Sequence, residues 1–88
     1  NGRSNADTRE REKTLRRTAR EAEAEVARLT ERRDGIDAAL ADPAKAKGPL
    51  SAMSVGELMK ARAELDHAIA AAEAAWLEAS DAMEQLAA

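Results

Sequence analysis

Apolar residues in this 88-residue chain recur at alternating spacings of three and four, in two long stretches separated by a segment that holds both prolines. Such spacing puts the apolar side chains along one stripe of a helix, which is the heptad pattern of a coiled coil. The first stripe contains Leu15, Ala19, Ala22, Val26, Leu29, Ile36 and Leu40, with Arg33 at the remaining position. The second contains Val55, Leu58, Arg62, Leu65, Ile69, Ala72, Trp76, Ala79, Met83 and Leu86. The sequence therefore predicts two long helices that pack along these stripes.

Bulky side chains are scarce in this sequence. It contains no Phe, Tyr or Cys and a single Trp, and alanine makes up most of its apolar residues. A globular core needs bulky apolar groups contributed from several directions, and this chain cannot supply them. Ala, Glu, Arg and Leu in helical periodicity are instead typical of coiled coils and long helices. We therefore expect an all-α fold, an antiparallel two-helix coiled-coil hairpin.

Local signals set the expected start of the fold. Residues 1–6, NGRSNA, look like the remnant of an expression tag, so we expect the hairpin domain to occupy residues 7–88. Asp7 and Glu10 have the spacing of a capping box, which predicts a first helix over about residues 8–42.

The second helix is preceded by a connector and a strong start signal. Residues 43–53 form the expected connector, with a short helical turn beginning at Pro43. Ser54 and Glu57 have the spacing of a second capping box, which predicts a helix over about residues 54–87.

The two stripes match each other when the helices run antiparallel. The facing pairs are then Ile36 with Leu58, Leu29 with Leu65, Val26 with Ile69 and Ala22 with Ala72. This register places the bulky Trp76 over the small Ala19, as interdigitated packing requires, so we expect Trp76 to be a packing residue.

The same register places two arginines opposite each other. Arg33 and Arg62 would repel if both were buried in the seam. We expect them to turn outward, toward Asp37 and Asp66, and to form a polar layer that fixes the register of the helices.

Charge is distributed unevenly along the chain. Residues 8–20 carry six basic and two acidic side chains, whereas residues 54–88 carry two basic and seven acidic ones. A cluster of cations on one segment is the pattern of a non-specific contact with the phosphates of DNA or ribosomal RNA. The candidate residues are Arg9, Arg11, Lys13, Arg16, Arg17 and Arg20, with Lys45 and Lys47 in the connector. The alternative is that the hairpin lays this segment beside Glu78, Asp81 and Glu84, which would neutralise it.

The sequence contains no motif for catalysis or for binding a cofactor. His67 is the single histidine and falls on the outward side of its helix, with no cysteine to join it in a metal site. No glycine-rich nucleotide-binding motif is present. We expect no enzymatic activity, no metal and no cofactor in this chain.

A second interaction surface is possible on the outer side of the second helix. Leu77 lies off the apolar stripe together with Ala70 and Ala74, and could contact another protein or a second copy. In that interpretation the chain is a structural or protein-interaction coiled coil that docks a partner or forms a homodimer. Because a two-helix core is small, a helix-exchanged dimer is an alternative to the single-chain hairpin, and the pairing of the two stripes is identical in both. With no cysteine there can be no disulfide framework, so we expect a cytoplasmic setting. No apolar run approaches the roughly 20 residues that span a bilayer, so we expect no membrane contact.

Three stretches together resemble the C-terminal coiled-coil domain of ABC-F family ATPases of the Uup-like group. They are LRRTAREAEAEVARLTERRDGIDAAL at 15–40, LADP at 40–43, and RAEL at 62–65 followed by EAAWLE at 73–78. The resemblance extends over residues 9–86, although the connector lacks the aromatic residue that often follows the Asp-Pro pair in the family.

This resemblance implies a larger parent protein. The parent would be a soluble ATPase that carries two nucleotide-binding domains, uses ATP and Mg²⁺, and acts on ribosomes or other nucleic-acid machinery. The hairpin would be its non-catalytic C-terminal arm, which binds nucleic acid or docks the protein there.

Overall fold

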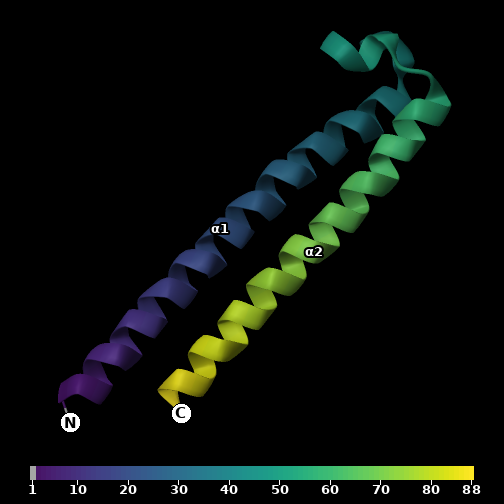
Figure 1. Ribbon diagram of the computed structural model, residues 1–88. Coiled ribbons are helices and arrows are strands. Elements are labelled where there is room, and N and C mark those ends of the chain that lie inside the picture. The colour runs from purple at the N-terminus through teal and green to yellow at the C-terminus, as the bar shows by residue number, and fades with distance from the viewer. Residues whose placement is uncertain (1) are drawn as a thin grey trace.

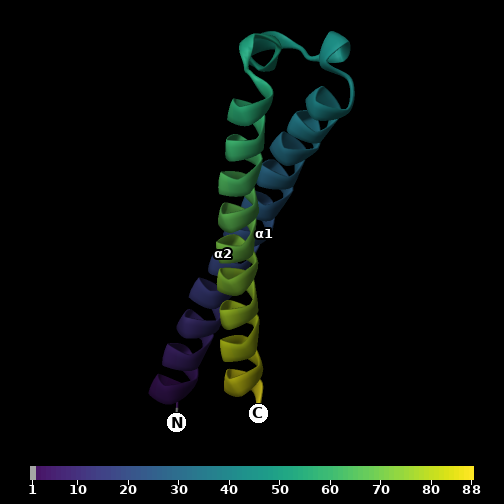
Figure 2. The ribbon, with the colours of Figure 1, turned by 90° about the vertical axis from the view of Figure 1, so that its right-hand side faces the viewer.

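Two long helices run antiparallel and side by side in the computed structural model, which describes the backbone of residues 2–88 and the side chains of residues 5–88. Helix α1 spans Gly2–Ala41 and helix α2 spans Val55–Ala87. A connector joins them at one end, and both chain ends lie at the other (Figure 1). The helices cross obliquely (Figure 2), and the molecule is a rod that measures 64 × 18 × 14 Å. The predicted all-α helical hairpin is confirmed.

Helix α1 begins earlier than the sequence predicts. Asp7 lies inside α1, which starts at Gly2, so its prediction as the N-cap is wrong. A capping side chain stabilises a helix start by only about 1 kcal/mol, and no proline stands before Asp7 to stop the helix there. The predicted tag remnant, residues 1–6, overlaps this first part of α1; residue 1 and the side chains of residues 2–4 lie outside the described residues.

The connector contains two short 3₁₀ helices, η1 at Pro43–Lys45 and η2 at Gly48–Ala52. Asp42 caps η1, because its side chain accepts a hydrogen bond of 3.2 Å from the backbone N–H of Ala44. The helical turn predicted to begin at Pro43 is therefore confirmed. Gly48 has a φ of +59°, a conformation that glycine adopts without strain.

The start of α2 follows the predicted capping box. The Ser54 hydroxyl accepts a hydrogen bond of 3.1 Å from the N–H of Glu57, whose carboxylate accepts one of 3.0 Å from the N–H of Ser54. The bond from the Ser54 backbone lowers the pKa of the Glu57 carboxyl. This reciprocal pair satisfies backbone donors that the first helical turn leaves without partners.

The core is a thin stripe between the helices. Its main cluster contains Leu29, Ile36, Ala39, Leu58, Leu65, Ile69 and Ala72. Ala19, Ala22 and Ala79 are buried toward the open end. Most of these residues belong to the predicted stripes, but Ala39 does not, and Val55 of the predicted second stripe is 58% exposed at the first position of α2.

Two arginines and two aspartates link the helices beside this core. Arg33 donates a hydrogen bond of 3.0 Å to Asp66, and Arg62 donates bonds of 2.5 Å to Asp37 and 2.9 Å to Asp66. The predicted outward turn of both arginines is confirmed. The hydrogen bond from Arg33, together with the charges of both arginines, lowers the pKa of Asp66. The hydrogen bond from Arg62 to Asp37 raises the pKa of Arg62.

We predict that Leu65→Ala destabilises the hairpin far more than Leu77→Ala. Leu65 is 7% exposed in the core, whereas Leu77 is 54% exposed on the same helix. Truncating a buried leucine costs about 2–5 kcal/mol, which is comparable to the whole stability of a small helical domain. An exposed truncation costs about 0.5 kcal/mol or less. Urea unfolding followed by circular dichroism measures both; equal losses in the two variants would contradict the described packing.

A second prediction concerns the acid dependence of stability. The folded pKa of Asp66 is lowered, so its stabilising effect is present above the unfolded pKa of about 4 and is lost as pH falls through the folded value. We therefore expect Asp66→Asn to lower Tm at pH 7, and the difference from the wild type to shrink below about pH 4. Asp81→Asn, which removes an exposed carboxylate on the same helix, is the control and should change Tm little. A difference for Asp66→Asn that persists to pH 2 would contradict this account.

Candidate nucleic-acid interface

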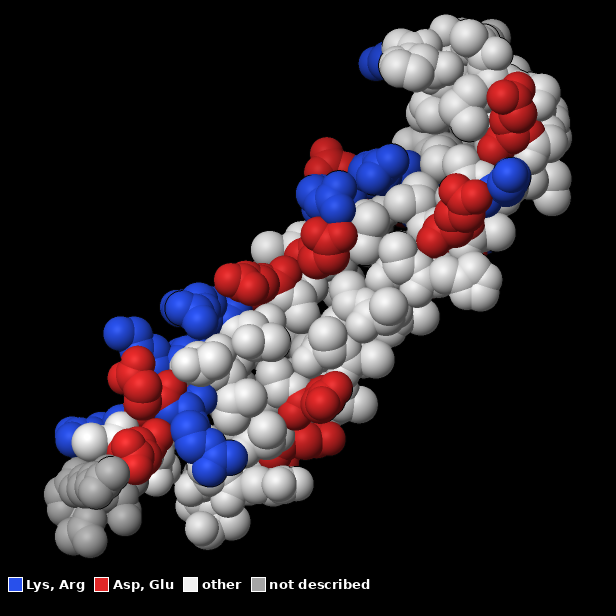
Figure 3. Space-filling model, viewed as in Figure 1, with Lys and Arg blue, Asp and Glu red and all other residues white. Residues whose placement is uncertain are grey.

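Four of the predicted cations form one face of α1. Arg9, Lys13, Arg16 and Arg20 are spaced by four, three and four residues, and all are exposed. Together with Glu12 they line one open hollow on the helix surface. We call the four cations the basic strip. Lys and Arg side chains gather over the N-terminal part of α1 in Figure 3, with carboxylates among them and further along the helix.

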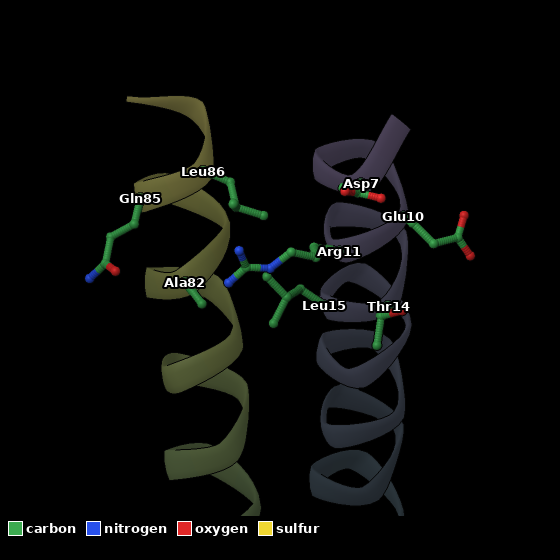
Figure 4. Close-up of a pocket in the computed structure, with 8 residues that line it drawn as sticks. All are labelled: Asp7, Glu10, Arg11, Thr14, Leu15, Ala82, Gln85 and Leu86. Atoms are coloured by element: carbon green, nitrogen blue, oxygen red, sulfur yellow. The ribbon is translucent and has the colours of Figure 1, made fainter. Parts of the chain in front are cut away.

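The other four predicted cations lie elsewhere. Arg11 reaches from α1 toward α2 at the open end of the hairpin, where it lines a hollow with Leu15 and Leu86 (Figure 4). Arg17 is exposed but does not line the hollow of the basic strip.

Lys45 and Lys47 lie at the opposite end of the 64 Å rod, in the connector. The ammonium group of Lys45 lies 3.9 Å from the carboxylate of Asp42. Of the eight predicted cations, the structure therefore brings four together.

Ion pairing leaves most of the basic strip free. Arg16 forms an ion pair with Glu12 one turn away on α1. Among the described residues, none of the four cations forms an ion pair with α2, and the ion pairs between the helices belong to Arg33 and Arg62. The strip lies on a side of α1 rotated by roughly 110° from the apolar stripe, since each residue advances about 100° around the helix. Direct pairing with Glu78, Asp81 and Glu84 is therefore absent from the described residues.

Beyond the basic strip, the same side of α1 becomes acidic and adjoins the only tryptophan. An open hollow there is lined by Glu23, Val26, Ala27, Thr30, Glu31 and Asp34 of α1 and by Glu73 and Trp76 of α2. We call it the acidic groove. It contains four carboxylates and no basic residue.

Trp76 does not occupy the predicted place in the seam. Its side chain is 42% exposed, and it lines the acidic groove rather than covering Ala19, which is 7% exposed. The residues buried at this level, Ala22, Ala72 and Ala79, are small, so the helices have too little space between them for an indole ring. The ring therefore lies at the edge of the seam. The run of alanines in both stripes was the sequence signal that pointed to this.

Other predicted residues keep their expected positions. Ala70, Ala74 and Leu77 are exposed on α2, and Leu77 and Ala74 line a shallow hollow with Glu78 and Asp81. His67 is exposed, as predicted.

Neither comparison with known proteins nor a search for metal-binding or membrane-spanning groups identifies a function for this chain. Comparison of the chain with protein-family models, with curated proteins and with solved structures finds no match. Within residues 5–88, no three His, Cys, Asp or Glu side chains are grouped so that they could hold a metal ion. Neither described helix contains a stretch that is long and apolar enough to cross a membrane. The charged and apolar surfaces are therefore the features of this molecule that point to a function.

We predict that Trp76 reports directly on the acidic groove. As the single tryptophan, half-exposed beside four carboxylates, it should emit at a wavelength close to that of a solvated indole. Relative to free indole in the same buffer at low ionic strength, caesium ions should quench Trp76 more efficiently and iodide less efficiently, because the carboxylates attract cations and repel anions. The Glu73→Gln and Glu31→Gln double variant should narrow that difference. If iodide quenching fell less than caesium quenching relative to free indole in the wild type, the groove would not be acidic.

Proposed function

We propose that the chain binds nucleic acid without sequence specificity, through phosphate contacts made by the basic strip. The supporting observation is that Arg9, Lys13, Arg16 and Arg20 lie exposed on one face of α1 and form no ion pair with α2. The strip covers 11 helical steps, or about 16 Å. That length corresponds to about five successive phosphates of one DNA strand.

Direct reading of bases is not part of this proposal. The hollow of the basic strip has no aromatic side chain on which a base could stack, and Trp76 lies in the acidic groove, where carboxylates repel phosphates. Binding to DNA and to RNA should therefore be similar, weak and sensitive to salt. Arg16 contributes less to phosphate binding than the other three cations of the basic strip, because Glu12 already pairs with it.

The resemblance in sequence to the C-terminal arm of Uup-like ABC-F ATPases is consistent with this role. We propose that the hairpin is such an arm in a cytoplasmic ATPase and brings its parent to nucleic acid. ATP and Mg²⁺ would bind in the nucleotide-binding domains of that parent. The arm itself would bind the nucleic acid. Because the rod is 64 Å long, its basic end lies far from the connector.

A second candidate function is docking to another protein through α2. Leu77 is 54% exposed and lies beside the exposed Ala74 in a shallow hollow, and Ala70 is exposed one turn before it. Leu77→Glu would remove this apolar contact without touching the basic strip.

The first function is tested by fluorescence anisotropy of labelled DNA and RNA oligomers over a salt series. With four phosphate contacts, the slope of log K against log salt should be about −3.6, so affinity should fall roughly a hundredfold between 50 and 200 mM salt. Replacing Arg9, Lys13 and Arg20 with Ala should make the slope shallower by about three. Lys45→Ala with Lys47→Ala is the matched control at the other end of the rod and should leave the slope nearly unchanged. No binding at about 50 mM salt, or binding unaffected by the triple substitution, would refute the proposal.

A further inference from the structure

One face of α1 reverses its charge halfway along the helix. The basic strip occupies positions 9, 13, 16 and 20, and further steps of three, four, four and three residues lead to positions 23, 27, 31 and 34. These later positions hold Glu23, Ala27, Glu31 and Asp34, all of which line the acidic groove. Because steps of three and four residues stay on one side of a helix, the two halves form one continuous surface of about 38 Å.

This surface is complementary to itself when a second copy is laid against it in the opposite direction. A two-fold axis between residues 21 and 22 places each position n opposite position 43 minus n. The facing pairs between copies are Arg9 with Asp34, Lys13 with Thr30, Arg16 with Ala27 and Arg20 with Glu23, and Glu31 is the next residue after Thr30. Each pair occurs twice, so the arrangement joins four directly facing pairs of opposite charge and places Glu31 one residue from the position opposite Lys13.

We infer that the acidic groove is a docking site for the basic strip of a second copy of this chain. The groove supplies the carboxylates that α2 does not supply to the strip within one chain. A parallel arrangement would place like charges opposite each other and is disfavoured, so the charge pattern also selects the antiparallel direction.

Arg16 and Trp76 define the centre of each half of this contact. Ala27 is the smallest residue of the facing set and leaves room for the Arg16 guanidinium of the second copy to enter the groove. Trp76, 42% exposed, and Glu73 line that groove from α2. To enter the groove, the Arg16 guanidinium gives up its exposed ion pair with Glu12 of its own helix. Above the indole ring and next to Glu73 it gains a cation–π contact and a charge-assisted hydrogen bond in exchange. Trp76, which is not buried between α1 and α2, would therefore be covered by the second copy in this contact.

A charge exchange at the two-fold axis tests the inference. Arg20→Glu places a glutamate opposite Glu23 of the second copy, and Glu23→Arg places an arginine opposite Arg20. Each single variant contains two such repulsive contacts, so the dissociation constant of its dimer should be at least tenfold higher than that of the wild type. The double variant, Arg20→Glu with Glu23→Arg, restores both attractive contacts and should recover dimerisation. Circular dichroism checks that all three variants remain helical.

Sedimentation equilibrium measures the result over about 10 μM to 1 mM protein, where a contact made of surface ion pairs is expected to form. The 9.4 kDa chain should approach twice its mass at about 20 mM salt and return to the monomer mass at about 500 mM. Leu77→Glu, on a different face, is the control and should not change the dimer.

Three results would overturn the inference. They are a monomer under all conditions, a dimer that high salt or Arg20→Glu leaves intact, and a double variant that stays monomeric while it is folded. A dimer dissociated by Leu77→Glu alone would assign the contact to α2 instead. The inference does not depend on nucleic-acid binding, because the samples contain none. Failure of either proposal therefore leaves the other standing.

Discussion

The burial of alanines between the two helices is the constraint on which the rest of this structure depends. Ala19, Ala22, Ala72 and Ala79 are buried along the half of the hairpin that holds the chain ends, and the larger residues there, Leu15, Met83 and Leu86, are only half-buried. An alanine gains less free energy from burial than a leucine, so this half of the core contributes little to stability. The larger residues Leu29, Ile36, Leu58, Leu65 and Ile69 are concentrated nearer the connector. Stability is therefore expected to be highest at the connector end and lowest where the basic strip lies.

Arg33, Arg62, Asp37 and Asp66 form a cluster that helps to fix the register of α1 against α2, which the buried alanines specify poorly. Alanines of similar size can slide past one another with little change in packing, whereas Arg33 and Arg62 each have defined acceptors on the opposite helix. Side chains that are 30–42% exposed avoid most of the cost of desolvation, so pairing them helps to align the helices without a large penalty. Arg33 still has one buried nitrogen, Nε, without a hydrogen-bond partner, which reduces what the cluster contributes.

The sequence was sufficient to predict the hairpin, the connector, the capping box at Ser54 and the outward turn of both arginines. These features depend on spacing and on residues close to each other in the chain, which a heptad pattern records. The start of α1 and the position of Trp76 were not predictable in the same way. A cap is a weak local preference that a continuing helix overrides, as at Asp7. The position of the indole depends on the distance between the helices, which all the alanines of the seam determine together.

The position of each residue around helix α1 explains which part of the candidate site the sequence could predict. A count of charges identified the cations of residues 8–20, but only the helical angle separates Arg9, Lys13, Arg16 and Arg20 from Arg11, which points toward α2. The same angle shows that Glu23, Glu31 and Asp34 continue the face of the strip. In the two proposals made above, phosphates and the carboxylates of a second copy are therefore rival partners for the same four cations. Since nucleic acid carries the denser negative charge, it should displace the second copy wherever both are present. Self-association would then cover the strip only when no nucleic acid is bound.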